Sequence, residues 1–478
     1  MPRCDVCRIC YSEEYEDGKG PFIRPTPCRC SGERSSIHFK CLERWQSFAR
    51  NQAIWDAGRR CHACGSTYKV TLDRRIPVGI LGGTGLVGRA LAAHLATHPL
   101  FRVGPVVGSN ATVGKPLAEV WRAKEAALEA HYGRNLWKAA PCPDVLDGIR
   151  VASVEDLIAS RCAIAVSAVA PALGHVEEAL QAAGVAVFSM SPHARDDPRN
   201  PLVVPEVNGM EWLGSSERNQ SKKLPLFKSP NCVVCGVGVA LAALDQAYGL
   251  AGLSVTTFQA LSGRGDAAYR PADLVVANVY PLSGTVERTD EFQRAELQRL
   301  FPRLEKCSVA AQRVPVRNGH FVRAGCALRR KPANLDDVRR VLRDFSPLRG
   351  LALPSAPSAP IVVLDDVGRP RPADDAHYEG GMAVAVGDIR LGRPDDLFDL
   401  SFALVVNNLV RGAYGAALLN AELYELHVRH RDDDPSSERD DAMALPSALH
   451  PGAPAKKNPQ PLAAAAALTI PAIDHLKK

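Results

Sequence analysis

Cysteine is the residue type whose spacing first indicates chemistry in this chain. The chain has 478 residues and 14 cysteines, and eight of these cysteines lie before residue 65. With one histidine, seven of the eight form the pattern C-x2-C-x17-C-x-C-x7-H-x2-C-x19-C-x2-C. A structural zinc ion takes four thiolate or imidazole ligands, so eight ligands predict two zinc ions. The predicted ligands are Cys7, Cys10, Cys28, Cys30, His38, Cys41, Cys61 and Cys64.

This segment resembles the RING-CH, or RING-variant, zinc finger. In that family the first and third ligand pairs hold one ion and the second and fourth pairs hold the other. The resemblance implies one site of Cys7, Cys10, His38 and Cys41, and another of Cys28, Cys30, Cys61 and Cys64. Such fingers commonly bind a ubiquitin-conjugating enzyme through an apolar residue and a tryptophan, at positions occupied here by Ile9 and Trp45. The alternative is a purely structural or protein-binding finger.

A further pair of cysteines lies in "KSPNCVVCGVG", where Cys232 and Cys235 have C-x-x-C spacing. Four interpretations are possible: a zinc half-site, a redox dithiol, a buried structural thiol or a single reactive thiol. The apolar spacing that follows is helical, which places Cys232 at a helix start. Unpaired N–H groups and the helix dipole there lower a thiol pKa. No second cysteine pair nearby completes a zinc site, so we expect Cys232 to be the reactive thiol and Cys235 to pack inside the helix.

The stretch "RRIPVGILGGTGLVGRALAAHL" predicts a strand over Ile76–Leu81, a tight turn and a helix. Glycines in such a turn allow the backbone to approach a pyrophosphate, which lies at the positive end of the helix. The sequence therefore predicts a dinucleotide site. Its expected contacts from this turn are Gly82, Thr84, Gly85, Leu86, Val87 and Gly88.

The end of the second predicted strand, "FRVGPVVGSN", favours NADP over NAD. An NAD site would carry an acidic residue there for the ribose hydroxyl. This chain has Ser109 and Asn110, followed by Lys115, and these groups suit a 2′-phosphate. "GSNATVGKP" is not a P-loop, because five residues separate its glycines and Pro116 replaces the magnesium-binding hydroxyl residue.

Helical and strand patterns alternate over residues 151–208, which predicts a parallel α/β sheet. The expected fold is a Rossmann-type domain plus an α+β substrate and dimerisation domain, preceded by the small zinc-bound domain. We expect the zinc finger at 1–70, the NADP-binding domain at 74–228 and the catalytic domain at 229–405. A helix near 406–425 should complete the NADP-binding domain, and the Pro- and charge-rich tail 428–478 is expected to be disordered.

From about residue 76 to 425 the chain resembles the aspartate-semialdehyde dehydrogenases, in particular the archaeal and fungal type. The segments that carry the resemblance are "GILGGTGLVG", "SNATVGK", "PLVVPEVN", "SPNC", "TTFQALSGRG", "NVYPLSG", "QRVPVRNGH", "GMAVAVGDIR" and "NNLVRGAYGAALLNAEL". They occur in the order and with the spacing of that family.

The resemblance implies a set of residue roles. Cys232 would be the nucleophile, and His320 would be the acid/base that takes the thiol proton and serves the hemiacetal oxygen. Gln259 would orient the substrate, and Arg313 would bind its α-carboxylate in bidentate fashion. Asn231 would help hold the phosphate or the oxyanion.

Two positions depart from the family pattern. The family has a Glu and, three residues later, a Lys after "SG", where this chain has Thr285 and Arg288, with Glu287 beside them. Arg288 can still bind phosphate, but the missing Glu puts recognition of the substrate amino group in doubt. Asn407 replaces a family histidine, whereas Asn408 is retained and is expected to contact the cofactor.

The implied function is NADP-dependent conversion of aspartyl 4-phosphate to aspartate 4-semialdehyde, toward lysine, methionine and threonine, by a homodimer or homotetramer. The alternatives are a malonyl-CoA reductase, a ubiquitin ligase that uses the dehydrogenase as a scaffold, and a finger joined to the enzyme by an error in the gene model. The net charge of +6 is evenly spread and predicts no nucleic-acid partner. No signal, transit or membrane segment is recognised, so we expect a cytoplasmic protein, with a plastid location left open.

Overall fold

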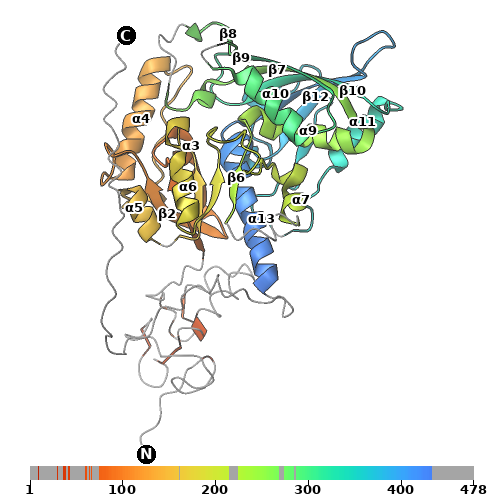
Figure 1. Ribbon diagram of the computed structural model, residues 1–478. Helices are drawn as coiled ribbons and strands as arrows, with labels where there is room; N and C mark the ends of the chain where they lie inside the picture. Colours follow the sequence, from red (N-terminus) through yellow and green to blue (C-terminus); the bar gives the residue numbers. More distant parts are fainter. Residues whose placement is uncertain are drawn as a thin grey trace, which may run out of the picture. The chain divides into compact units, whose positions relative to one another are not determined.

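The computed structural model shows two β-sheets with helices packed against them (Figure 1). It describes residues 75–160, 162–214, 224–267, 274–284, 287–351 and 353–432. Of the N-terminal region it describes Ile9, Arg29, Cys30, Ser36, Ile37, His38, Cys41, Leu42, Arg60, Cys61, Cys64 and Ser66.

Among the described residues, six parallel strands form the first sheet, in the order β3-β2-β1-β4-β5-β6. Its strands are β1 (Ile76–Leu81), β2 (Phe101–Val107), β3 (Val151–Ala152), β4 (Ile164–Ser167), β5 (Ala186–Ser189) and β6 (Leu226–Lys228). The helical segments between them are α3 (Leu86–Thr97), α4 (Leu117–Tyr132), η3 (Asp144–Leu146), α5 (Val154–Ala159), η4 (Pro171–Leu173), α6 (His175–Ala182), η5 (Pro205–Gly209) and α7 (Met210–Leu213).

β1 is the strand at which the winding of this sheet reverses. It pairs with β2 on one side and with β4 on the other, and ligands of such sheets bind beyond the strand ends at this point. Val78 and Ile80 are fully buried because helices cover both faces of a parallel sheet. The observed strand has the predicted bounds, and α3 follows it directly after the glycine turn. The Rossmann-type fold prediction is confirmed.

The second sheet has mixed strand directions and the order β11-β12-β13-β10-β7-β9-β8. Its strands are β7 (Leu250–Gln259), β8 (Tyr280–Pro281), β9 (Lys306–Arg313), β10 (His320–Leu328), β11 (Ile361–Val363), β12 (Val384–Leu391) and β13 (Leu400–Val406). The associated helical segments are α9 (Cys232–Tyr248), η6 (Leu261–Arg264), α10 (Thr289–Leu300), α11 (Leu335–Asp344), α12 (Pro372–Asp375), η8 (Tyr378–Gly381), η9 (Val410–Tyr414) and α13 (Gly415–Asp432).

Three described helices pack against one face of the mixed sheet. α9, α10 and α11 pack there, and Figure 1 shows them together in front of the strands. On β10, Val322 and Ala324 point into this core and are buried, whereas Phe321 and Arg323 are half-buried on the other face. This alternation follows from the two-residue period of a strand.

α13 joins the core of the parallel sheet although it follows the mixed sheet in sequence. Its Ala417 and Leu418 belong to the same buried cluster as Ile80 and Phe188, and the rings of Phe188 and Tyr424 lie 5.8 Å apart. The chain thus returns to the first sheet after completing the second.

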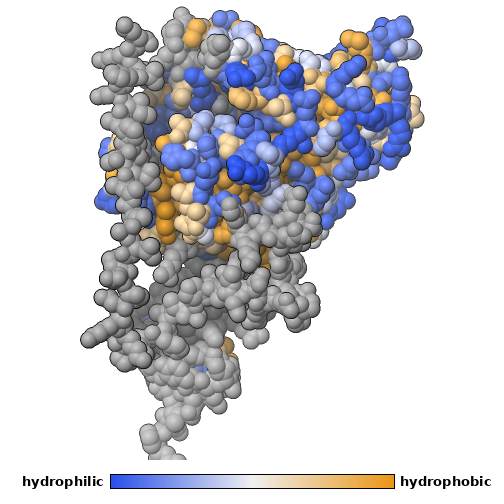
Figure 2. All heavy atoms as spheres, viewed as in Figure 1, coloured by the Kyte–Doolittle hydropathy of each residue, from blue (hydrophilic) through white to orange (hydrophobic). Residues whose placement is uncertain are grey.

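Hydrophilic residues dominate the visible surface over the mixed sheet and its helices, with small hydrophobic patches between them (Figure 2). No helix among the described residues is long and apolar enough to cross a bilayer. The expected disordered tail lies outside the described residues, except that residues 428–432 continue α13.

Candidate active site

The nucleophile candidate Cys232 is the first residue of α9, as the sequence predicts. Asn231 caps this helix because its Oδ1 accepts a hydrogen bond from the Val233 N–H at 3.0 Å. The Cys232 thiol also lies 3.7 Å from the same Oδ1. Cys235 is fully buried one turn further on, and its thiol donates to the Pro230 carbonyl at 3.3 Å.

Cys232 and His320 lie side by side although 88 positions separate them in sequence. The Cys232 Sγ is 3.1 Å from His320 Nε2, and the other ring nitrogen, Nδ1, accepts a hydrogen bond from the Ala260 N–H at 2.9 Å. A ring nitrogen that accepts carries no proton, so this hydrogen-bond network assigns the proton of the neutral imidazole to Nε2. His320 therefore donates to the sulfur in this state, and its expected role as the acid/base that takes the thiol proton stays a prediction.

Burial dominates the protonation of this pair. It raises the pKa of Cys232 to about 11, although the Arg313 guanidinium opposes the shift. Burial also holds the pKa of His320 well below its usual range, and the Arg313 charge adds to that effect. The expectation that the helix start lowers the thiol pKa is wrong for the ligand-free protein, because desolvation of the thiolate outweighs the helix dipole.

These pKa directions predict how the Cys232 thiol reacts. In the ligand-free protein, the rate of its alkylation by iodoacetamide should rise about tenfold per pH unit from pH 7 to 10. The reason is that, below the pKa of the thiol, the thiolate fraction rises about tenfold with each pH unit. Mass spectrometry of the Cys232 peptide measures the rate separately from the other cysteines. A plateau near neutral pH would show instead that the helix start dominates.

Gln259 and Arg313 end two adjacent strands, where β7 and β9 pair them in register. Arg313 is 3% exposed, and its Nη1 donates to the Ala260 carbonyl at 2.8 Å. Gly263 keeps Arg313 and His320 close together, because a Cβ there would lie 2.7 Å from Arg313 Nη1 and 3.1 Å from the His320 ring. The structure thus brings Gln259, Arg313, His320 and Cys232 together.

Glu287 joins this group, but Arg288 does not. The Glu287 carboxylate accepts from Arg264 Nη1 at 2.5 Å and lies 3.4 Å from Arg313 Nη2. The Arg288 side chain is 58% exposed and pairs with Glu291 at 2.5 Å. Its predicted role in phosphate binding stays a prediction, and Thr285 lies outside the described residues.

The glycine turn lies at the carboxyl end of β1 and has the packing of a dinucleotide-binding turn. Gly82 has φ of +77°, and a Cβ on Gly88 would lie 2.4 Å from the Gly82 carbonyl oxygen. Only glycine allows α3 to approach the turn this closely. Thr84 and Gly85 end the turn, and Leu86, Val87 and Gly88 open the helix, whose N–H groups are free of side-chain capping.

The loop after β2 lies beside this turn. A Cβ on Gly108 would lie 2.5 Å from Thr112 Oγ1 and 2.9 Å from Thr84 Cγ2, so both segments meet there. The loop contains Ser109, Asn110 and Lys115, and all three are exposed. The predicted cofactor residues of the two segments are therefore neighbours, at the reversal point of the sheet.

Asn408 contacts residues around His320. Its Oδ1 accepts from the Gly319 N–H at 2.9 Å, and its Nδ2 donates to Ser262 Oγ at 2.8 Å. Asn408 thus links Gly319, which precedes His320 in the chain, to Ser262 of η6. Its expected contact with the cofactor stays a prediction.

In the N-terminal region, the described cysteines cluster as zinc ligands do. The sulfurs of Cys30, Cys61 and Cys64 lie within 4.8 Å of one another, and those of Cys30 and Cys61 are 3.7 Å apart. Tetrahedral zinc with Zn–S bonds of about 2.3 Å places two sulfurs about 3.8 Å apart, so the spacing fits. His38 Nδ1 lies 3.8 Å from Cys41 Sγ, as a second site would require. Cys7, Cys10 and Cys28 lie outside the described residues.

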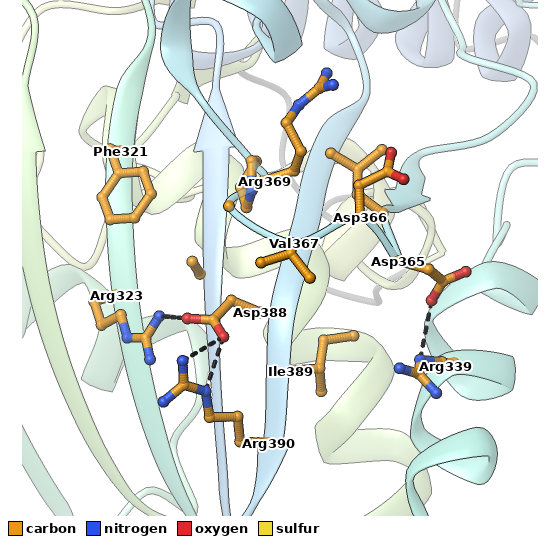
Figure 3. Close-up of a pocket in the computed structure, with 14 residues that line it drawn as sticks. Phe321, Arg323, Arg339, Asp365, Asp366, Val367, Arg369, Asp388, Ile389 and Arg390 are labelled. Carbon is orange, nitrogen blue, oxygen red and sulfur yellow. Dashed lines mark hydrogen bonds and ion pairs between the residues drawn. The ribbon is translucent and has the colours of Figure 1, made fainter.

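A cavity of about 520 Å³ lies elsewhere, on the half-exposed face of the mixed sheet. Figure 3 shows Asp388 between Arg323 and Arg390, with Phe321 above them on β10. His320 and Phe321 are adjacent on one strand and therefore point to opposite faces. This cavity is separate from the Cys232–His320 pair.

Sequence reasoning missed several residues that shape the site. Gly412 lies in close contact with the nucleophile, since a Cβ there would lie 2.7 Å from the Cys232 Cβ. Gln293 and Glu296 of α10 both contact Asn231. The quoted segments "SGRG" and "RGAYG" contain Gly263 and Gly412, but nothing in the sequence places Gln293 beside Asn231.

Comparison with known proteins agrees with this arrangement. Residues 77–214 match the semialdehyde dehydrogenase NAD binding domain, residues 241–411 its dimerisation domain, and residues 7–64 the RING-variant domain. An aspartate-semialdehyde dehydrogenase of Trichophyton rubrum is 34% identical over 72% of this chain and 95% of its own length. A malonyl CoA reductase (NADP) of Metallosphaera sedula is 28% identical over 74% of this chain and 97% of its own length.

The fold gives the same result. The structure of aspartate semialdehyde dehydrogenase with NADP from Candida albicans superposes with a TM-score of 0.61 at 25% identity. The match covers 74% of this chain and 99% of that one. The chain therefore belongs to the aspartate-semialdehyde dehydrogenase family, and a RING-variant domain precedes its dehydrogenase region.

Proposed function

We propose that this protein converts aspartyl 4-phosphate to aspartate 4-semialdehyde with NADPH. The observation that carries the proposal is the 3.1 Å contact between Cys232 Sγ and His320 Nε2, with the buried Arg313 beside both residues. A thiol, a proton donor and a buried cation form a site for acyl transfer from an anionic substrate. The family membership supports the same reaction.

Cys232 supplies the nucleophile in this mechanism. The thiol loses its proton, the sulfur attacks the acyl carbon and the bond from that carbon to the phosphate oxygen breaks, so that a thioester forms and the inorganic phosphate leaves with the proton. NADPH, when bound, supplies the hydride that reduces the thioester. The Nε2–H of His320 faces the reacting centre and donates a hydrogen bond to the resulting oxyanion, which collapses to the aldehyde and returns the Cys232 thiolate. Asn231 Nδ2 makes no hydrogen bond among the described residues, and we assign it to the phosphate or the oxyanion.

Arg313, Arg264 and Glu287 form the substrate-recognition group. Arg313 would bind the α-carboxylate of the substrate, which its planar guanidinium matches in geometry. Glu287 would bind the substrate ammonium in place of the missing family Glu, because its carboxylate lies against Arg313 and Arg264. Gln259 would orient the carbonyl region between Arg313 and His320.

The glycine turn and the loop after β2 would hold NADP. The close packing of Gly88 on Gly82 leaves the backbone N–H groups of the α3 start available to a pyrophosphate. Ser109, Asn110 and Lys115 carry no negative charge, and the Lys115 ammonium would attract a 2′-phosphate. We expect NADP to be preferred over NAD on this basis.

A spectrophotometric assay tests the proposal in the reverse direction. The wild-type protein should reduce NADP with aspartate semialdehyde only when inorganic phosphate is present, since phosphate must release the acyl group from Cys232. NADP should be used more efficiently than NAD. Oxidation of NADPH by malonyl-CoA, without activity on aspartate semialdehyde, would support the malonyl-CoA reductase alternative instead.

We propose that the N-terminal finger binds two zinc ions. Metal analysis of the purified chain should give two equivalents, and Cys61→Ser should lose one of them, because the 3.7 Å Cys30–Cys61 pair would lose a thiolate ligand. Cys307→Ser is the matched control, since Cys307 lies in β9 and should leave both ions in place. Equal zinc content in Cys61→Ser and the wild type would contradict the site.

A second proposed activity of the finger is ubiquitin transfer, with a ubiquitin-conjugating enzyme as partner. It is supported by the RING-variant match and by the apolar residue Ile9 between the first two predicted ligands. Autoubiquitination with a panel of conjugating enzymes tests it, with Cys61→Ser as the inactive control. A chain that binds zinc but transfers no ubiquitin would leave the finger with a structural or binding role.

We further propose a cytoplasmic homodimer or homotetramer. The match to a dimerisation domain supports association, and the half-exposed face of the mixed sheet is the surface we assign to it. The ring centroids of Phe258 and Phe321 lie 6.0 Å apart on that face, beside the Arg323–Asp388 ion pair. A reducing compartment suits both the free Cys232 thiol and the zinc thiolates.

A further inference from the structure

Helix α10 holds Asn231, the residue before the nucleophile, at two separate atoms. Gln293 Nε2 donates to the Asn231 side-chain Oδ1 at 2.9 Å. The Glu296 carboxylate accepts a hydrogen bond from the Asn231 backbone N–H at 2.5 Å. The two residues are three positions apart and therefore lie on one face of the helix. Asn231 is thus fixed in both its backbone and its side chain.

The orientation of the Gln293 amide is determined by this network. Asn231 Oδ1 accepts from the Val233 N–H, so it is an oxygen and must receive a donor from Gln293. Gln293 is fully buried, and its Oε1 has no hydrogen-bond partner among the described residues. Burying an amide with one unsatisfied atom costs free energy. The hydrogen bond from Nε2 to Asn231 is the contact that offsets part of this cost.

Glu296 extends the contact to the other sheet. Its carboxylate pairs with Arg195 Nη1 at 3.0 Å, and both side chains are about nine-tenths buried. Arg299, one turn further along α10, donates to the Arg195 carbonyl at 2.6 Å and to the Asn200 carbonyl at 2.5 Å. The segment that follows β5 is therefore attached to the same helix that holds Asn231.

The N-terminal end of α10 reaches the substrate-recognition group. Arg288 caps the helix with a left-handed backbone, and Glu287 just before it contacts Arg264 and Arg313. One continuous helix of 12 residues therefore begins at the substrate-recognition group and touches the nucleophile segment in its second turn.

We propose that Gln293 and Glu296 are positioning residues that orient Cys232 through Asn231. The inference rests on the proposed function, because it takes Cys232 as the nucleophile. Loss of either contact frees the Asn231 segment and misaligns the sulfur. A misplacement of about 1 Å costs about 100-fold in rate, so kcat should fall while KM changes little.

Two substitutions at one position separate positioning from packing. Gln293→Met keeps the size of the side chain but cannot donate, and we expect kcat to fall about 10- to 100-fold at every pH. In Gln293→Glu the buried carboxyl can donate to Asn231 only when protonated, so its kcat should recover toward the wild-type value as pH falls from 8 to 6. Gln298→Met is the matched control, because Gln298 lies exposed on the same helix. Circular dichroism and thermal melting check that each variant is folded.

Glu296→Gln separates positioning from electrostatics. Removing the carboxylate charge should speed alkylation of Cys232 by iodoacetamide, because Glu296 raises and Arg195 lowers the pKa of that thiol. Positioning predicts that kcat nevertheless falls about tenfold, since Gln cannot satisfy Asn231 and Arg195 as the carboxylate does. Faster alkylation with an equal or higher kcat would overturn the proposal.

The remaining outcomes are also decisive. A pH-independent kcat in folded Gln293→Glu, equal to that of Gln293→Met, would reduce Gln293 to a packing residue. If the wild-type protein fails to use aspartate semialdehyde, the proposed function fails, and kcat is then measured with malonyl-CoA. The alkylation rates need no substrate, so unchanged alkylation in Glu296→Gln would contradict the electrostatic effect of Glu296 and leave the fall in kcat as the test of positioning.

Discussion

Cys232→Ala should lower the rate of phosphate-dependent NADP reduction by at least about 10⁴-fold, because the acyl group has no other acceptor. The thiol is the side chain that lies 3.1 Å from His320 Nε2 in the site. Binding of NADP should be unaffected, since the glycine turn lies on another element. Fluorescence titration with NADPH and the steady-state assay measure the two properties on the same preparation.

Cys235→Ala is the matched control for this substitution. Cys235 lies on the same helix and is fully buried, and burial raises the pKa of its thiol. We expect kcat close to the wild-type value and a loss of about 1 kcal/mol in the free energy of unfolding, from the smaller side chain. If both alanine variants lost activity equally, a dithiol mechanism would replace the single-nucleophile mechanism.

Local patterns predicted the elements that carry the site. The apolar run Ile76–Leu81 became β1, and the helical spacing after Cys232 became α9 with Asn231 as its cap. These predictions succeeded because hydrophobic period, glycine position and helix capping depend on neighbouring residues. Family resemblance supplied the rest, since composition alone does not join Cys232 to His320.

The protonation of the site was not predictable, because it depends on burial by distant segments. A helix start favours a thiolate, yet the surrounding protein raises the pKa of Cys232 to about 11. The His320 tautomer depends on the Ala260 N–H, which only the approach of η6 to β10 brings to the ring. Neither effect has a signal in the local sequence.

Charge in the site is arranged so that one buried cation acts on both reacting groups. The Arg313 guanidinium lowers the pKa of Cys232 and that of His320, so it favours a thiolate beside a neutral imidazole. Glu287 lies against Arg313 and offsets part of this charge. A substrate carboxylate that binds Arg313 would offset more of this charge, so its binding to Arg313 would raise the pKa of Cys232 rather than lower it.

Gly263→Ala should therefore be among the most damaging substitutions outside the nucleophile. An added Cβ would lie 2.7 Å from Arg313 Nη1 and 3.1 Å from the His320 ring, so both side chains must move. We expect KM for aspartate semialdehyde to rise and kcat to fall, with a combined loss in kcat/KM of about 100-fold or more. Steady-state kinetics over a range of substrate concentrations separates the two contributions.

Gly238→Ala is the control for the change of residue type. Gly238 lies within α9, and a Cβ there would meet its nearest neighbours, Leu300 and Val207, at 3.9 Å. Alanine should therefore fit and stabilise the helix by about 0.5–1 kcal/mol, with kcat/KM unchanged. If Gly263→Ala retained full activity, Arg313 and His320 would have to act from positions other than those around Gly263, and the site geometry would be wrong. A loss of kcat with unchanged KM would instead assign the effect to His320 alone and leave Arg313 outside substrate binding.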